Sequence, residues 1–290
     1  MPVPSPESLQ ALDLSRERND VFNLVITCNP KGAMAAMCAS MKNSRAIALN
    51  EATADKGLAM TSSATSMMIA AQFLGSMRDE KFYLDSTEKL AKAAERLIKS
   101  SDIERFDSVA EPDLKGAVGK MLAQGTERLM IIGWRGLYGA AVEGALKFME
   151  TGDGTVASMA ETPLGVRHGP ISFLNAKTCA LFLLSSNPDH RRYEMDLVNQ
   201  VLAKKLSGLL FAAGSGIPKE VADVVDLAID YESDVPDDLR PPLDVVLAQI
   251  LAVSTSKRLG FDVDNPSKRG AIARVVEGAR MYPVSGKASG

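Results

Sequence analysis

Three charged residues on one predicted helix are the first candidates for chemistry. Glu143, Lys147 and Glu150 are spaced by four and three positions, which brings their side chains to neighbouring faces of a helix. They could form a surface stripe of ion pairs. Alternatively, a carboxylate at the end of this apolar helix, beside Met149, would have a raised pKa and could move a carbon-bound proton. The spacing alone leaves both interpretations open.

The only two histidines offer a second source of proton transfer. His168 follows Arg167 in a run of turn formers, where it is either a loop histidine that bonds to the backbone or an acid–base group that works near neutral pH. His190 is flanked by charged residues, so we expect it at a solvated helix start.

Hydroxyl groups gather at the start of a different predicted helix. Thr61 and Ser62 begin this helix, and more hydroxyls follow at Ser63, Thr65 and Ser66. Hydroxyls and free N–H groups at a helix N-terminus can hold a phosphate. Capping of the helix by itself explains one or two of these residues, so the cluster is a candidate phosphate site rather than a clear one.

Signals for a cofactor are weak. The loop Gly133-Trp134-Arg135-Gly136 follows a predicted strand, but it has neither the glycine spacing of a dinucleotide-binding loop nor the Lys-Ser/Thr pair of a P-loop. The two histidines and three cysteines are too scattered to supply a set of metal ligands. We therefore expect no nicotinamide, ATP or metal, and hence no cofactor.

Composition bounds the class of protein. The 290 residues are 46% hydrophobic and 24% charged, with a net charge of −3, which is typical of a globular protein and argues against a nucleic-acid partner. The sequence shows neither a long uninterrupted apolar run nor a signal peptide. We therefore expect a cytoplasmic protein that does not enter a membrane.

Apolar runs and helical periods alternate along the chain, which predicts an α/β fold with parallel sheets. We predict strands at residues 21–27, 45–49, 128–133, 178–184, 206–212 and 225–229, and helices at 5–18, 32–41, 60–77, 79–101, 138–150, 193–204 and 243–259. A first unit with a connector helix is placed at 1–105 and a second unit at 106–290. The first unit is expected to be incomplete, because no strand precedes its first helix. Helix 60–77 is apolar nearly all round, so we expect it to be buried on most faces.

Two neighbouring stretches resemble the sugar isomerase (SIS) family. They are residues 143–150, EGALKFME, and residues 162–170, TPLGVRHGP. The resemblance is strongest to tagatose-6-phosphate ketose/aldose isomerase, also named galactosamine-6-phosphate deaminase/isomerase, and further matching stretches lie at 5–8, 26–29, 57–62, 185–187 and 264–267. It implies two flavodoxin-like α/β/α units of three layers, in proteins that pair as homodimers or as dimers of dimers.

The resemblance also implies roles for individual residues. Glu150 would shuttle a proton between C1 and C2 of an opened sugar, and Lys147 would help to fix the substrate and the charge of an enediol-like intermediate. His168 would assist ring opening, often in the site of a neighbouring subunit. The residues that we expect to bind the substrate, a phosphorylated hexose or hexosamine, are Ser5, Thr61, Ser62, Arg135 and Arg167.

One part of the family pattern is missing from this sequence. Family members carry an upstream strand and a Ser-x-Ser-Gly-x-Ser phosphate loop, of which only Ser5 has a counterpart here. We expect a whole catalytic half and a shortened phosphate site. The expected reaction converts galactosamine-6-phosphate into tagatose-6-phosphate and ammonia. Plain aldose–ketose isomerisation and a non-catalytic sugar-phosphate-binding module remain alternatives.

Overall fold

The computed structural model describes residues 6–101, 114–274 and 282. The chain forms two compact units, residues 1–71 together with 269–290, and residues 72–268. The boundary that the sequence suggests between residues 105 and 106 lies outside the described residues, so it stays a prediction.

The described part of the first unit contains a small parallel sheet. Its strands are β1 (Asn23–Thr27) and β2 (Ser44–Ala48), and its other elements are α1 (Pro6–Leu14), α2 (Ala33–Ala39), the 3-10 turn η1 (Glu51–Thr53) and the start of α3 (Ser62–Gly75). Leu12, Val25 and Cys38 form a small core against methionine side chains from α2 and the residues after it. The first helix is shorter than expected, since it ends at Leu14 rather than near Arg18.

The expected burial of α3 is wrong for the described part of the chain. Of its 14 residues only Ser63 is buried, and its apolar side chains are half-buried or exposed. A helix that is apolar on all sides needs neighbours on all sides, and the described residues do not supply them.

The second unit is built on a five-stranded parallel sheet in the order β4-β3-β5-β6-β7. Its strands are β3 (Arg128–Gly133), β4 (Ala157–Glu161), β5 (Thr178–Leu183), β6 (Leu209–Gly214) and β7 (Leu227–Asp230). Its helices are α4 (Glu80–Ser101), α5 (Leu114–Ala123), α6 (Arg135–Thr151), α7 (Pro188–Ala203), α8 (Lys219–Ala222) and α9 (Pro241–Arg258), with 3-10 turns η2 (Met77–Asp79), η3 (Gly165–His168) and η4 (Pro170–Phe173).

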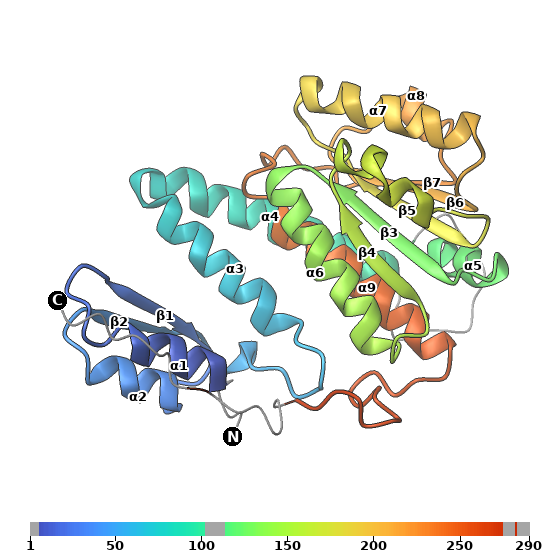
Figure 1. Ribbon diagram of the computed structural model, residues 1–290. Helices are drawn as coiled ribbons and strands as arrows, with labels where there is room; N and C mark the ends of the chain where they lie inside the picture. Colours follow the sequence, from blue (N-terminus) through green and yellow to red (C-terminus); the bar gives the residue numbers. More distant parts are fainter. Residues whose placement is uncertain (1–5, 102–113, 275–281, 283–290) are drawn as a thin grey trace. The chain divides into compact units, whose positions relative to one another are not determined.

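Two helical layers cover this sheet (Figure 1). Helices α7 and α8 pack on one face, where Phe182 and Leu210 meet Leu197 and Val201. Helices α6 and α9 pack together on the other face. The strand order reverses between β3 and β5, so the loops after these two strands border a crevice at the carboxyl edge of the sheet. The expected α/β class with flavodoxin-like strand order is thus confirmed.

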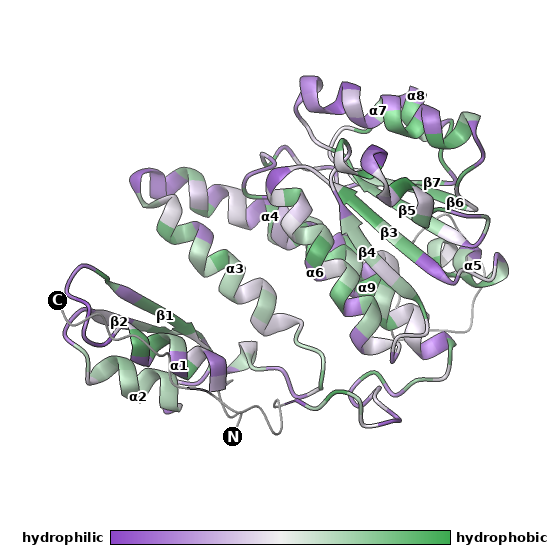
Figure 2. Ribbon diagram, in the orientation of Figure 1, coloured by the Kyte–Doolittle hydropathy of each residue, from purple (hydrophilic) through white to green (hydrophobic). Residues whose placement is uncertain are grey.

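Strand burial explains which strands could be predicted. Strands β3, β5 and β6 are buried on both faces, so their sequences are continuous apolar runs, and Figure 2 shows them as hydrophobic ribbons. The edge strand β4, with the sequence Ala-Ser-Met-Ala-Glu, was not predicted. It contains no β-branched or aromatic residue, and its pairing with β3 is what makes it a strand.

Helix α4 is long but strongly amphipathic, with buried residues on one side and charged ones on the other. Within the described ranges, no helix combines the length and the apolar character needed to cross a membrane.

Candidate functional site

The end of α6 holds a buried lysine between two carboxylates. The Lys147 side chain is 3% exposed, and its Nζ lies 2.5 Å from Glu150 Oε2 and 3.2 Å from Glu143 Oε1. The two glutamates are each about one quarter exposed, at 24% and 23%. The predicted ion pairs therefore exist, but they surround a buried ammonium rather than forming a solvated stripe. Such a site holds a fixed positive charge next to a carboxylate that solutes can reach.

Packing of α6 against α9 explains why this lysine is buried. Thr151 Oγ1 donates a hydrogen bond to the Lys147 carbonyl oxygen at 2.8 Å, and Ser256 Oγ of α9 donates to Thr151 Oγ1 at 2.9 Å. These bonds hold the last turn of α6 against α9. The expectation of an apolar, water-free neighbour is wrong, however, because Met149 is 41% exposed on the opposite side of the turn.

The predicted histidine lies in a separate turn. His168 ends η3 and is exposed, and its imidazole forms no hydrogen bond with the described residues. Gly169 follows with φ of 130°, a value that side-chain-bearing residues rarely adopt. Arg167 is half-buried, and its Nε is buried without a hydrogen-bond partner among the described residues.

Within one chain, His168 and Glu150 lie at opposite edges of the second sheet. Glu150 is in the last turn of α6, just before the chain enters β4 at Ala157, whereas His168 follows the end of β4. The five residues of β4 alone span about 17 Å. The second unit therefore does not bring the two groups to one small sugar.

In the first unit, a carboxylate occupies the expected phosphate cradle. Asp55 accepts hydrogen bonds from Thr61 N and Oγ1 at 3.0 and 2.9 Å, from Ser62 N at 2.9 Å, and from Ser63 N and Oγ at 2.9 and 2.6 Å. Burial opposes ionisation of Asp55, but these hydrogen bonds outweigh it and lower its pKa. Thr61 and Ser62 are thus brought to one anion-binding helix start, and the anion there is a side chain of the protein.

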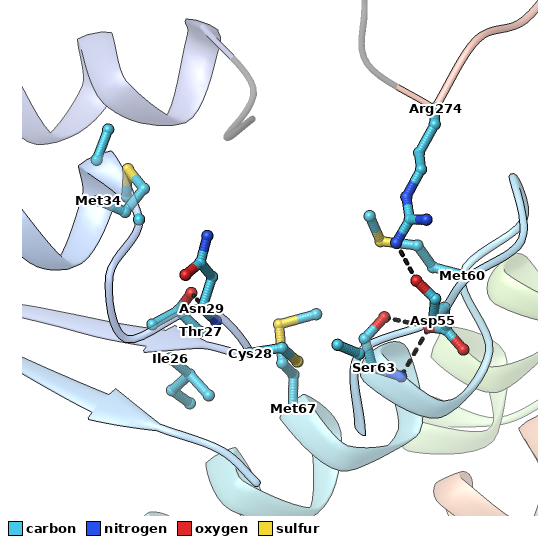
Figure 3. A pocket seen from close by; sticks show the side chains of 13 residues that line it. Ile26, Thr27, Cys28, Asn29, Met34, Asp55, Met60, Ser63, Met67 and Arg274 are labelled. Atoms are coloured by element: carbon cyan, nitrogen blue, oxygen red, sulfur yellow. Dashed lines mark hydrogen bonds between the residues drawn. The ribbon is translucent and has the colours of Figure 1, made fainter. Parts of the chain in front are cut away.

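The same helix start borders a pocket of about 290 Å³ (Figure 3). Thr27, Cys28 and Asn29 line it from the loop after β1, and Asp55 lines it from the side of α3. The guanidinium of Arg274 donates to the backbone carbonyls of Asp55 and Lys56. Asp55 and Arg274 could not be predicted as site residues from the sequence, because their partners are defined only by the folded chain.

Arg135 lies far from the Lys147 cluster. It is the first residue of α6, and Glu150 is in the last turn, so the two are about 22 Å apart along the helix axis. The structure does not bring Arg135 and Glu150 of one chain into one site, and the expectation that both contact the substrate stays a prediction. Ser5, the remaining predicted ligand, lies outside the described residues.

Arg135 instead borders a second pocket of about 290 Å³ in the crevice at the carboxyl edge of the second sheet. Trp134 stacks on His190 there, with ring centroids 5.0 Å apart. His190 lies at the exposed start of α7, as expected, but its side chain is half-buried. Asp237 and Asp238 line the same pocket.

A buried polar network that the sequence did not indicate supports this second pocket. Asp237 accepts from Ser185 Oγ at 2.5 Å and from Ser186 N at 3.0 Å. Arg240, which is fully buried, donates to Asp237 at 3.1 Å and to Asp244 at 3.0 Å. Burial opposes ionisation of Asp237, but the Ser185 hydrogen bond and the Arg240 charge lower its pKa overall.

Comparisons with known proteins agree with these features. No family model matches the chain. A Streptomyces coelicolor protein named as a candidate D-galactosamine-6-phosphate deaminase AgaS is 34% identical over 284 residues, which is 97% of this chain and 70% of the relative. D-galactosamine-6-phosphate deaminase AgaS of Escherichia coli O157:H7 is 30% identical over 96% of this chain and 69% of its own length. A crystal structure from Clostridium novyi, a candidate tagatose-6-phosphate ketose/aldose isomerase, has a TM-score of 0.86 at 28% identity and covers 96% of this chain and 69% of that one.

The parallel three-layer unit and these similarities define an enzyme of the SIS phosphosugar isomerase class. Within that class, the chain belongs to the D-galactosamine-6-phosphate deaminase AgaS family. The chain spans about 70% of the length of these relatives. The predicted family is therefore confirmed, while the roles assigned to individual site residues stay predictions.

Proposed function

We propose that the protein converts galactosamine-6-phosphate into tagatose-6-phosphate and ammonia. The observation that carries this proposal is the Glu150–Lys147 pair, in a chain related to proteins named for that deamination. A proton shuttle needs a carboxylate that a substrate can reach, and an enediol-like intermediate needs a fixed positive charge beside its oxygen. Glu150 and Lys147 are 2.5 Å apart and supply both.

The proposed reaction begins after the sugar ring has opened. The Glu150 carboxylate takes the proton from C2 and returns it to C1, which converts the amino aldehyde into a ketose imine. Lys147 stabilises the negative charge on the oxygen at C1 while the proton is on Glu150. Water then adds to C2 of the imine and ammonia leaves, which gives the ketose phosphate.

An ammonia assay with matched variants tests this proposal. Glu150→Gln should lower ammonia release from galactosamine-6-phosphate by about 100-fold or more, the size expected for loss of a general base. Glu143→Gln removes the other carboxylate that contacts Lys147 and is the control, with an expected decrease of less than about tenfold. Equal effects of the two substitutions would contradict the assignment of Glu150. Ketose formation from an unaminated sugar phosphate, without ammonia release, would identify plain isomerisation instead.

A second candidate is a non-catalytic sugar-phosphate-binding module, and one observation favours it. The helix start expected to hold phosphate is filled by Asp55, which accepts hydrogen bonds from Thr61, Ser62 and Ser63. Binding of galactosamine-6-phosphate that survives Glu150→Gln, in a wild-type protein that shows no turnover, would support this candidate. We also infer a cytoplasmic location and assembly into homodimers or dimers of dimers.

A further inference from the structure

The crevice of the second unit contains two opposite charges whose side chains pair with none of the described residues. Arg135 and Asp238 both line the pocket described above and both are exposed. Neither side chain forms an ion pair or hydrogen bond with a described residue. Opposite charges in one concave site ordinarily pair, because an ion pair at 4 Å or less is attractive even near water. Here both side chains border the same space of about 290 Å³.

The rest of the pocket wall is held rigid. Ser186 donates its backbone N–H and its hydroxyl to the Asp237 carboxylate at 3.0 and 2.9 Å, and Arg240 donates to the same carboxylate at 3.1 Å. Asn187 accepts from two backbone N–H groups at the start of α7. These groups already have partners, so Arg135 and Asp238 are the charges left for a ligand.

The part of the pocket around Arg135 combines stacked aromatic side chains with a constrained backbone. Trp134 is stacked on His190, and Tyr193 meets the edge of Trp134 at 6.1 Å between ring centroids. Arg135 has φ of 46°, the left-handed region, which costs about 1 kcal/mol for a residue with a side chain. A Cβ at Gly136 would lie 3.2 Å from Pro241 Cγ and 3.8 Å from the Asp237 carbonyl oxygen, so the start of α6 packs closely against the segment that carries these two residues.

We propose that this crevice is a second small-molecule site, and that it binds a sugar phosphate carrying an amino group. Arg135 would contact the phosphate, Asp238 the ammonium group, and the Trp134–His190 pair the sugar face. A guanidinium and a carboxylate that line one pocket match a ligand that carries both an anionic and a cationic group. The site lies at the start of α6, about 22 Å along that helix from Glu150, so the Glu150 of the same chain does not reach a ligand bound there. The choice of amino sugar rests on the proposed function.

Trp134 makes the test direct, because it is the only tryptophan in the sequence. The Glu150→Gln protein, which should not consume the ligand, is titrated with galactosamine-6-phosphate while tryptophan emission is recorded. We expect a saturable change in emission. Arg135→Ala should weaken the apparent affinity at least about tenfold, because a hydrogen bond to a charged group contributes about 1.5–3 kcal/mol. Arg192→Ala removes an exposed arginine outside the pocket and is the matched control.

A sugar phosphate without the amino group distinguishes the contribution of Asp238 to binding from that of Arg135. Galactose-6-phosphate lacks the amino group and should bind at least about tenfold more weakly than galactosamine-6-phosphate. Asp238→Asn should remove that difference, whereas Asp189→Asn, the matched exposed control, should retain it. An Arg135→Ala protein with unchanged affinity, or two sugars that bind equally to the protein with Asp238 intact, would overturn the proposal.

The ammonia assay keeps the two proposals apart. If wild-type protein releases no ammonia but the emission change still depends on Arg135, the proposed reaction fails and the second site stands. If ammonia is released while emission does not respond to the ligand, the second site alone is overturned.

Discussion

Individual side chains in this protein show how burial changes the chemistry of a residue. Glu194 in α7 is 1% exposed, and both its carboxylate oxygens accept from Ser185 N at 3.0 and 3.1 Å. Burial raises its pKa from 4.5 to about 7, although the Ser185 hydrogen bond and the charges of Arg191 and Arg240 oppose this change. Folded protein therefore binds more protons at Glu194 than the unfolded chain does between these two pH values.

This difference predicts how stability depends on pH. Because the pKa of the acid is higher in the folded state, the free energy of unfolding should fall as the pH rises from about 4.5 to about 7, by up to about 3 kcal/mol from this group. Glu194→Gln should be nearly as stable as wild type at pH 5 and more stable at pH 8. Urea unfolding at both pH values measures this, with the exposed Glu220→Gln as control. A Glu194→Gln protein that follows the wild-type pH dependence would show that this carboxyl is not the cause.

At the scale of elements, the contact between α6 and α9 is what buries Lys147. Gly144 allows the two helices to approach, since a Cβ at this position would lie 2.7 Å from Ala248 Cβ and 2.9 Å from Ile131 Cδ1. The Ile131 methyl group can shift, but the Ala248 Cβ is fixed to its backbone. The small residue therefore sets the distance between the helix that carries the candidate catalytic groups and the helix that supports it.

Two alanine substitutions on α6 test the importance of this approach. Gly144→Ala should lower the free energy of unfolding by about 1–3 kcal/mol, because overpacking outweighs the better helix propensity of alanine. Gly139→Ala, on an exposed position of the same helix with open space around it, should raise it by about 0.5–1 kcal/mol. Thermal unfolding of both variants provides the comparison. Stabilisation by both substitutions would mean that α6 and α9 have room to separate.

At the scale of the whole molecule, the separation of Glu150 and His168 bears on the assembly. The two groups lie at opposite edges of the second sheet within one chain, so a site that uses both needs a second copy. Val142, Leu146 and Met149 form an exposed apolar stripe on α6, at 47%, 39% and 41% exposure, which agrees with association but does not identify the partner surface.

Mixing two inactive variants tests whether sites are shared between chains. Glu150→Gln and His168→Asn homodimers should each be inactive, and a mixed dimer should contain one site with both residues intact. Random exchange of subunits should then restore about one quarter of wild-type ammonia release. Sedimentation should give a mass of at least twice 31.0 kDa. A protein that sediments as a monomer, or a mixture that stays inactive after confirmed exchange, would exclude shared sites.

The strands of the second unit other than β4, and the charged cluster on α6, could be predicted from the sequence alone. Strands such as β3 and β5 are buried on both faces, so their apolar runs are visible without the fold. Glu143, Lys147 and Glu150 meet because helical spacing is local. The family motif around Glu150 and His168 is also a property of the sequence, and it identified the family correctly.

The surroundings of these residues depend on tertiary packing and could not be predicted from the sequence. Lys147 is buried because α9 covers α6, Asp55 fills the helix start that was expected to hold phosphate, and β4 is a strand because β3 pairs with it. The crevice that brings Arg135 and Asp238 together joins segments about a hundred residues apart in the chain. Such contacts depend on which elements pack together, and no local pattern of residue types records that choice.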